Sequence, residues 1–578
     1  MNKRKIAKLC GLAAWFLSFL VLVGCNTQYV YDETNYYTGD TWDLNQSVLN
    51  GRDFLEDKSI YEKDEDGSIR YLYLTVKAGM NREMNKEYSF SYLNNYTTGE
   101  LSEGEEPFCD IIMSEGTQDS SYGLSLFGFG ETDPNGQITI KGNTDRIRLR
   151  SYQIKLFDRG GTWNDMKTIN LYKNRNDLSR MRQKFGFDLL EELPPIGSLR
   201  TGFVRLFIQD TTADGPKAYQ DMGIYTFIEQ PNNAYLAAHE LDTNGSLYRA
   251  EHFDFSRFPE QLVEKGAPDY SKEAFETILN IRNAENHSKL LNMLDVLHDD
   301  SIVFSDLLGR YFNEENLLTF AAVNVLLSNY RLAFEDYLIY SPQNSLTWYL
   351  IPSSFEDAMY HKVGQNDQVI PTSFEGYGFL YNNVLYRKYL TEPGNTQKLV
   401  QKIEEIREIL SDEWIEQQTL TYRKSILQYL FSIPEIMLLP KAATYVEPYI
   451  ADFSRIVDYN YQAVFANLKK PISPYIVQVE YQEESLEISF LGDDLQSGRV
   501  TQFRLELSTT SDFKSILFTS PPTSEHRVQI QELPNTTLYA RIVATDQTGA
   551  TQTSSNLSRD SKGEIYYGCV VLERRGSE

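Results

Sequence analysis

The sequence of 578 residues is poor in cysteine, histidine and positive charge. It contains four cysteines and six histidines, and its 81 acidic residues outnumber 55 lysines and arginines, for a formal net charge of −26 at pH 7. No cysteine and histidine spacing resembles a zinc site. Nucleic acid and anionic membrane faces both require a basic patch, so this charge argues against either as a partner.

The few cysteines divide into two groups. Cys10 and Cys25 lie in the first 25 residues, whereas Cys109 and Cys569 lie near opposite ends of the remaining chain. The sequence leaves open a disulfide between Cys109 and Cys569 in an oxidising compartment. We favour the alternative of two isolated, buried thiols.

The N-terminus combines a basic start with a short apolar run. Lys3, Arg4 and Lys5 precede the apolar stretch 11–23, and the run Leu-Val-Gly-Cys ending at Cys25 fits a bacterial lipobox. The stretch is short for a membrane span, which needs about 20 apolar residues. We predict a cleaved signal peptide over 1–25 and lipidation of Cys25, with an uncleaved anchor helix as the alternative. The protein would then be extracytoplasmic and lipid-anchored to the bacterial cell membrane.

The rest of the chain has enough apolar residues, 41%, to form two to four packed domains. Residues 26–68 are polar and charged and are predicted to form a tether. Period-two patterns then predict strands at 71–76, 88–92 and 123–129 and on either side of a turn within 138–156, followed by strands at 204–208 and 223–228. Helical patterns predict helices at 181–193, 273–297, 315–327 and 397–410, with more helix to about 468.

A boundary is predicted at Lys469-Lys470-Pro471, where short alternating strands begin. The run 533–542, Leu-Pro-Asn-Thr-Thr-Leu-Tyr-Ala-Arg-Ile, resembles the fibronectin type III signature. We therefore predict a small all-β sandwich over 470–578. Nothing in it suggests catalysis, so a spacer or adhesive role is expected.

One motif in the middle of the chain carries chemistry. Gly142-Asn143-Thr144 reads as a tight turn, and the following strand, Ser-Tyr-Gln-Ile-Lys-Leu at 151–156, carries Lys155. Together with collinear blocks at 167–171, 177–182, 223–230, 245–248 and 348–352, it resembles the CotH family of spore-coat-type atypical kinases. The resemblance implies an α+β, two-lobed atypical kinase-like domain over 69–468. A separate small β domain for the first strands is the alternative.

The resemblance also implies a nucleotide site. Phosphoryl transfer needs a cation on the phosphates of ATP, carboxylates that hold Mg²⁺, and a carboxylate that orients the acceptor hydroxyl. Lys155 matches the family's strand lysine and Glu229 matches its glutamate. We expect the two to form an ion pair inside a cleft.

The metal and base motifs depart from the family pattern. Arg331 stands at the position of the catalytic aspartate, and arginine neither accepts a proton nor binds Mg²⁺. In the metal motif one aspartate is replaced by Ser354 and the other by Glu356, and serine is a poor Mg²⁺ ligand. Asp336 and Glu356 could rebuild a metal site, and Arg331 could contact a phosphate.

Two functions from different classes follow. The favoured one is a pseudokinase-like binding or scaffold protein of the cell envelope, with the membrane and envelope or surface proteins as partners. The alternative is an active kinase that uses ATP and Mg²⁺ to phosphorylate Ser or Thr of envelope or spore-coat-type proteins. Its catalytic residues would be Lys155, Glu229 and Asp336, with Glu356 and Asp336 on the metal. In both, Lys155, Glu229 and Arg331 are the candidate nucleotide contacts.

Overall fold

The computed structural model describes most of the chain after residue 52. The described ranges are 53–64, 68–97, 105–121, 127–142, 149–215, 217–359, 370–481, 485–492, 501–531, 536–561 and 564–573. The predicted signal peptide with Cys25, the Asn143-Thr144 part of the turn, and residues 123–126 of an expected strand lie outside these ranges. Residues 48–578 form one compact unit. Within the described ranges, no helix is both long and apolar enough to cross a bilayer.

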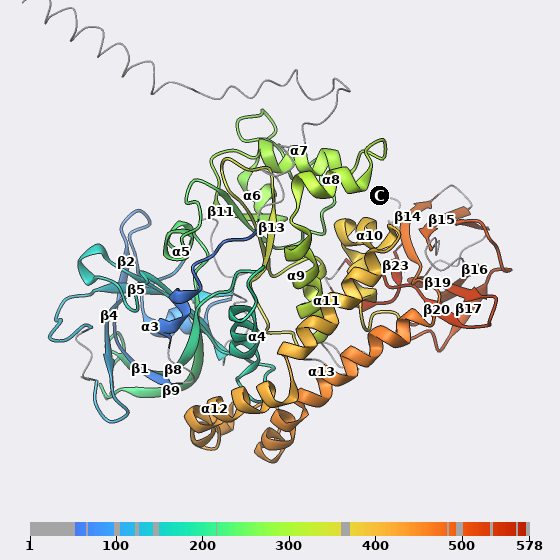
Figure 1. The fold of residues 1–578 in the computed structure, drawn as a ribbon. Helices are drawn as coiled ribbons and strands as arrows, with labels where there is room; N and C mark the ends of the chain where they lie inside the picture. Colours follow the sequence, from blue (N-terminus) through green and yellow to red (C-terminus); the bar gives the residue numbers. More distant parts are fainter. Residues whose placement is uncertain are drawn as a thin grey trace, which may run out of the picture. The chain divides into compact units, whose positions relative to one another are not determined.

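Seven strands close into a barrel in the first part of the unit (Figure 1). They are β1 (Ile69–Lys77), β4 (Cys109–Gly116), β5 (Gly136–Lys141), β6 (Ser151–Leu156), β7 (Thr168–Tyr172), β8 (Thr201–Asp210) and β9 (Gln220–Glu229), in the order β1-β4-β5-β6-β7-β9-β8. The closing pair β1–β8 is parallel and the other pairs are antiparallel. Side chains alternate between the two faces of each strand, so Tyr152, Ile154 and Leu156 are buried while Lys155 is exposed.

Two expected strands in this part differ from the structure. The described end of the expected strand 123–129, residues 127–129, forms a turn. Residues 88–92 were expected as a strand, but the hairpin strands β2 (Gly79–Asn81) and β3 (Lys86–Tyr88) are followed by helix α3 (Phe90–Asn95). The Ser89 side chain accepts a hydrogen bond from the backbone N–H of Tyr92, which caps the helix start. The aromatic alternation was therefore a poor guide here, because a local cap decides the backbone conformation.

A second sheet and ten α-helices follow among the described residues of 182–468. The sheet has the order β11-β10-β12-β13, built from β10 (Ser246–Ala250), β11 (Leu279–Asn283), β12 (Tyr337–Ser341) and β13 (Tyr349–Pro352). The longer helices are α4 (Arg182–Glu191), α7 (Ser288–Leu297), α8 (Phe304–Tyr311), α9 (Glu314–Leu326), α10 (Val384–Thr391), α11 (Asn395–Ile409), α12 (Asp412–Leu430) and α13 (Val446–Leu468). The predicted helix 273–297 is wrong in its middle, where strand β11 pairs with β10 between the short helix α6 (Lys272–Glu276) and α7.

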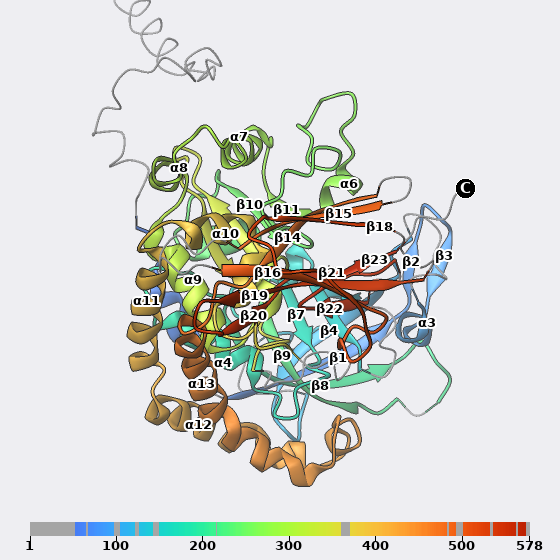
Figure 2. The ribbon, with the colours of Figure 1, turned by 90° about the vertical axis from the view of Figure 1, so that its right-hand side faces the viewer.

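The C-terminal part is all-β, as Figure 2 shows in orange to red. One sheet has the order β14-β15-β18, from Tyr475–Tyr481, Ser485–Leu491 and Arg527–Gln531. The other has the order β17-β16-β19-β20, from Ile516–Thr519, Thr501–Ser508, Leu538–Asp546 and Thr551–Thr553, with β23 (Val570–Leu572) also on β19. Both sheets contribute to one apolar core. A small hairpin, β21 (Leu557–Arg559) with β22 (Ile565–Tyr567), completes this part.

Two further sequence expectations can be compared with the structure. Cys109 and Cys569 are both free and buried, as favoured, and burial raises the pKa of each thiol to about 12. The described part of the predicted tether, 53–64, is instead packed, because Phe54, Ile60 and Tyr61 are buried in the folded unit. The mixture of helices and strands agrees with the α+β class.

Candidate functional site

Lys155, the expected phosphate-binding lysine, lies on the outer face of the barrel. Its strand neighbours are Gln137 on β5 and Thr168 on β7, and its side chain is exposed. Lys155 makes no ion pair with any described residue, Glu229 included.

Glu229 lies on the opposite side of the sheet from Lys155. The strand register aligns Ile154, Ile169 and Glu229 in one row across β6, β7 and β9. Residues directly opposite one another in a sheet project to the same face, so Glu229 shares the face of Ile154. Lys155 is adjacent to Ile154 in sequence and therefore projects to the other face. The predicted Lys155–Glu229 ion pair is wrong for this reason of strand parity.

Glu229 instead belongs to a buried network with a histidine. One Glu229 oxygen, Oε2, lies 2.8 Å from His239 Nε2, and the other nitrogen of His239 lies 2.7 Å from Glu56 Oε1. The backbone N–H of Arg200 also donates to Glu229 at 3.2 Å. Burial lowers the pKa of His239, but the two carboxylates outweigh this and raise it to about 9. Glu229 therefore pairs with the protonated imidazole of His239, and this pair has a structural role.

Arg331 lies at the centre of a group of carboxylates. It comes from the short 3₁₀-helix Tyr330–Ala333, directly before β12. Its Nε–H donates to Glu335 at 2.8 Å, and its guanidinium nitrogens lie 2.5 Å from Asp357 and 3.6 Å from Asp336. Burial lowers the pKa of Arg331, but these three carboxylates outweigh it and raise the pKa above its usual value.

A second guanidinium joins this group from the neighbouring strand. Arg249 on β10 lies 2.5 Å from Asp336 and 2.7 Å from Glu251. The residues Arg249, Arg331, Glu335, Asp336 and Asp357 are called the Arg331 cluster below. Each of its three carboxylates has an arginine partner. The planar guanidinium group can bind several carboxylates at once, because its N–H donors point in different directions.

The backbone around the Arg331 cluster has an unusual conformation. Ser328, Asp336 and Met359 adopt positive φ angles of 46°, 64° and 60°, although none is glycine. The Asn329 side chain donates to the Ser354 carbonyl at 3.0 Å, which joins the two segments. Such strained residues gather at functional sites, where the surrounding structure holds them in place.

The expected metal ligands do not form a metal site among the described residues. No group of three or more acidic, histidine or cysteine side chains there could hold a metal ion. Asp336 is bound by two arginines, Glu356 is partly exposed, and the Ser354 hydroxyl accepts from Gln183 at 3.1 Å and from the Glu356 N–H at 3.2 Å. Because the carboxylates carry guanidinium partners, the residues present do not fit Mg²⁺.

Two cations beside the Arg331 cluster were not expected from the sequence. Lys141, at the end of β5, has its pKa lowered to about 8 by burial and by the charges of Arg282 and Arg249. Arg282 likewise has its pKa lowered by burial and by Arg249. Neither side chain has an ion pair or hydrogen bond to a described residue, and Arg282 Nε is buried without a partner. Lys141 and Arg282 are called the cation pair.

The position of Arg282 has a local cause. Leu247 pairs with Asn283 and Tyr248 pairs with Ile281, so Arg282 is the extra residue of a β-bulge between β10 and β11. A bulge re-aims the side chain at that position, and bulges are enriched beside active sites. Lys141 directly precedes the Gly142-Asn143-Thr144 turn, which is the signal that could have identified it, and Arg282 lay in a segment predicted as helix.

The tyrosine Tyr172 connects these groups. Burial raises the pKa of Tyr172, and the charges of Arg249, Asp336, Arg282 and Glu356 act on it. The Arg331 cluster, Arg282 and Glu356 therefore all lie near the phenol of Tyr172. This convergence of charges makes the region the candidate ligand site.

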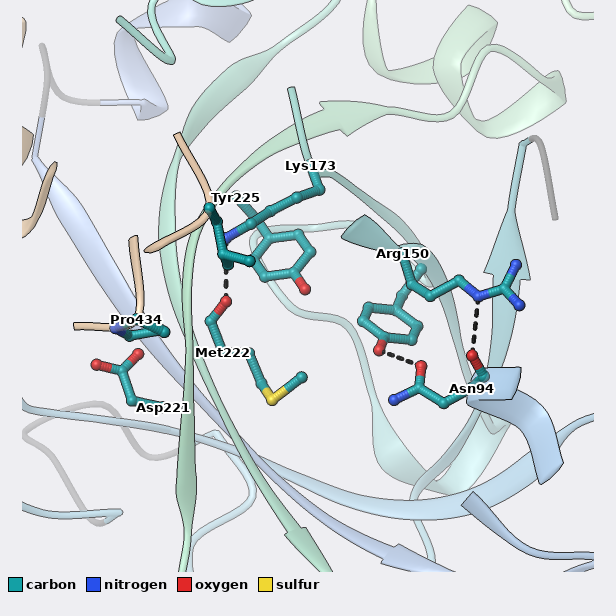
Figure 3. Close-up of a pocket in the computed structure, with 9 residues that line it drawn as sticks. Asn94, Arg150, Lys173, Asp221, Met222, Tyr225 and Pro434 are labelled. Carbon is teal, nitrogen blue, oxygen red and sulfur yellow. Dashed lines mark hydrogen bonds between the residues drawn. The ribbon is translucent and has the colours of Figure 1, made fainter. Parts of the chain in front are cut away.

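A small cavity of about 120 Å³ elsewhere in the barrel has a different character (Figure 3). It is lined by Asn94, Arg150, Tyr152, Lys173, Asp221, Met222, Tyr225, Pro434 and Leu438. The Lys173 ammonium donates to the Met222 and Ile224 carbonyls at 3.0 and 2.9 Å and lies 2.5 Å from Glu435. All of its donors are used within the protein, so Lys173 is structural. None of the predicted site residues lines this cavity.

Comparison with known families identifies the chain. The profile of the family described as CotH kinase protein matches residues 138–447, more than half of the 578 residues. The chain therefore belongs to the CotH kinase protein family. The matched region runs from β5 to the start of α13 and contains the Arg331 cluster and the cation pair.

Two solved fibronectin type III domains are similar to a small share of the chain. A human structure described as the fourth FNIII domain has 13% identity, covers 18% of this chain and 78% of that chain, with a TM-score of 0.14. The sixth fibronectin type III domain of human fibronectin type III domain containing protein 3 has 22% identity, with 19% and 92% coverage and a TM-score of 0.14. No curated protein matches the sequence.

Proposed function

We propose that this protein is a pseudokinase-like member of its family that binds a phosphorylated ligand without a metal ion. The observation that carries the proposal is Arg331, which stands where the family has its catalytic aspartate and pairs with Glu335, Asp336 and Asp357. A fixed guanidinium supplies the positive charge that a metal ion would otherwise supply to these carboxylates. It cannot accept the proton of an acceptor hydroxyl.

The cation pair supports binding of an anion. Lys141 and Arg282 are half-buried, lie beside a third cation, Arg249, and have no ion pair to any described residue, with Glu251 as a nearby carboxylate. Burying unpaired positive charges is unfavourable unless a ligand compensates them. A phosphate chain offers that compensation, because its oxygens accept hydrogen bonds from both lysine and arginine. The triphosphate of ATP is the phosphate chain implied by the family.

An active kinase remains the second candidate. Asp336 and Glu356 both act on Tyr172, so two carboxylates share one environment, and Asp336 would have to release its arginine partners to hold Mg²⁺. In this alternative the two-lobed kinase arrangement would have the barrel as its first lobe and the helical part as its second.

The proposal includes the cellular setting that the N-terminal sequence suggests. A lipidated Cys25 would hold the protein at the outer side of the bacterial cell membrane, with envelope or surface proteins as partners. Nucleotides are scarce outside the cell, which favours a binding role over housekeeping phosphorylation. Replacing Cys25 with alanine should release the protein from the membrane fraction or leave the precursor unprocessed.

The decisive experiment is a titration of the purified mature protein with ATP, with Mg²⁺ and with excess chelator, followed by an assay for transfer of the γ-phosphate. We expect binding that does not require Mg²⁺ and no phosphorylation of the protein itself or of generic acceptors. Lys141→Ala should weaken binding and Lys155→Ala, on the outer face, is the matched control. Robust autophosphorylation that Asp336→Asn abolishes would establish the active kinase instead.

A further inference from the structure

We infer that the C-terminal β-sandwich contributes to the ligand site, because its Arg559 acts as a positioning residue for Arg331. The inference rests on the proposed function for its ligand, but its structural half can be tested without one. It differs from the spacer or adhesive role that the sequence suggested for 470–578.

Hydrogen bonds between backbone groups of the sandwich and side chains of the helical part attach the two to each other. The Ser554 carbonyl accepts from the Ser373 hydroxyl at 2.8 Å, and the Ser555 carbonyl accepts from the Asn382 amide at 2.7 Å. The Leu557 N–H donates to the Asn382 side-chain oxygen at 2.7 Å. Ser554 and Ser555 are fully buried, so their backbone groups would lose partners if the two parts separated.

Close apolar packing reinforces this attachment. The rings of Phe374 and Tyr567 meet edge to face with centroids 5.3 Å apart. Gly568 has a φ of 77°, and a Cβ atom at this position would lie 2.8 Å from the Pro371 side chain. Glycine is therefore required both by the backbone conformation and by the closeness of the helical part.

Arg559 extends from β21 of the sandwich to the Arg331 cluster. Its Nη2 lies 3.2 Å from Glu335 Oε1, the same oxygen that accepts a hydrogen bond from Arg331 Nε at 2.8 Å. The guanidinium also lies over the Phe334 ring, 5.6 Å from its centroid. Glu335 is thus held between one arginine of the family region and one of the sandwich.

Tyr567 brings the same hairpin close to the other side of the cluster. Burial raises the pKa of Tyr567 to about 12, and the charges of Asp357, Arg331, Glu335 and Arg559 act on it. The other charged groups that face Arg559 and Arg331 here include His252, whose pKa is lowered by burial and by both arginines. The β21–β22 hairpin therefore shares the electrostatic environment of Arg331.

A coupling between docking and ligand binding follows from this geometry. Without Arg559, Glu335 would keep Arg331 as its described ion-pair partner. Arg331 also pairs with Asp336 and Asp357. The orientation of Arg331 would then change, and so would the charge presented to a phosphate. Two sites that bias one element must affect each other reciprocally.

The test uses the full chain and the variants Arg559→Ala, Arg559→Lys and Arg527→Ala. Arg527 is the matched control, because it forms a similar ion pair in the sandwich, 3.3 Å from Glu487, on strand β18. Hydrogen exchange of residues 330–336 is measured without ligand, and affinity is measured for inorganic triphosphate in chelator. We expect faster exchange and about fivefold or more weaker affinity in Arg559→Ala, partial rescue in Arg559→Lys, and no change in Arg527→Ala.

The two arms separate this inference from the proposed function. If the parent protein does not bind triphosphate, the proposed anion binding fails, and the exchange arm still decides the role of Arg559. Unchanged exchange at 330–336 in Arg559→Ala, with unchanged exchange in strand β15 as evidence of a folded sandwich, would overturn the inference. Equal triphosphate affinity in Arg559→Ala and the parent would also overturn it.

Discussion

Two groups of ionised side chains in this protein look alike in composition but differ in their access to water. The Lys173 cluster, made of Lys173, Arg180 and Glu435, has side chains that are each about 1% exposed. In the Arg331 cluster, Arg331, Arg249 and Asp336 are 27%, 25% and 18% exposed. The first has its lysine donors filled by the protein, whereas the second lies beside Lys141 and Arg282, which form no ion pair with a described residue.

The difference separates a structural ionic group from one suited to a ligand. Glu435 joins the loop after α12 to the barrel through Lys173 and also accepts from the Ile224 N–H at 3.1 Å. A closed, dry network of this kind specifies how elements pack. A partly exposed network beside two cations that form no ion pair with a described residue leaves capacity for an incoming anion. The following predictions test this distinction, beginning with the largest expected effect.

Removing the carboxylate of the Lys173 cluster should destabilise the fold most. Glu435→Ala leaves Lys173 and Arg180 buried without their counter-charge, which should lower the free energy of unfolding by about 3–5 kcal/mol. Chemical denaturation would measure the loss. Glu447→Ala is the control, because the Glu447–Arg423 pair is solvent-exposed and should change stability by less than about 1 kcal/mol. Equal effects of the two substitutions would contradict the structural role of the Lys173 cluster.

The buried His239 network should make stability depend on pH. The folded-state pKa of His239 is about 9, above its ordinary value of 6.5, so the folded state holds the proton more tightly. The stabilisation is complete below about pH 6.5 and is lost as the pH rises through 9. It should amount to about 3 kcal/mol.

The measurement for His239 is a difference between two proteins. Lys173 has a pKa lowered to about 8 by burial and contributes with the opposite sign at higher pH. Denaturation curves from pH 6 to 9.5 are therefore compared for the parent and His239→Gln. We expect the stability advantage of the parent to shrink across this interval. A constant difference between the two proteins would show that His239 is not held as an imidazolium.

A smaller effect is expected for the central arginine of the Arg331 cluster. Arg331→Asp leaves four carboxylates close together with Arg249 and Arg559 as their described ion-pair partners, and should destabilise the protein by about 1–3 kcal/mol in chelator. The partial exposure of Arg331 keeps this below the effect at Glu435. Mg²⁺ should restore part of the lost stability, and adding Ser354→Asp should strengthen that response. A thermal midpoint that does not respond to Mg²⁺ in either variant would contradict the idea that Arg331 replaces a metal ion.

Local patterns predicted much of the fold. Alternation marked β5, β6 and the main sandwich strands, and helical spacing marked α9 and α11, because each of these elements buries one regular face. The expected strand at 88–92 and the expected helix over β11 were wrong, because a serine cap and a pairing with β10 outweighed the local pattern. Such tertiary and capping effects are only weakly encoded in a short stretch of sequence.

The candidate site was predicted less completely, and its residues show why. Arg331 and Asp336 were identified from motif positions, and the structure brings them together. The cation pair depends on a β-bulge at Arg282, and Arg559 lies more than 200 positions from Arg331, so neither contact leaves a signal in local spacing. Lys155 was placed on the wrong face because a motif fixes a residue's position in sequence but not the parity of its strand.

The smallest expected effect concerns Lys155, and it sharpens the comparison between an outer and an inner lysine. Lys155→Ala removes an exposed side chain without an ion pair to any described residue, so unfolding should change by no more than about 0.5 kcal/mol. Triphosphate affinity should also be unchanged. Lys141→Ala, on the adjacent strand β5, removes a half-buried cation and should weaken triphosphate binding about tenfold, a loss near 1.4 kcal/mol. Isothermal titration of both variants in chelator measures the contrast. If Lys155→Ala abolished binding while Lys141→Ala did not, the phosphate site would lie on the outer face of the barrel, and the assignment of the cation pair would be wrong.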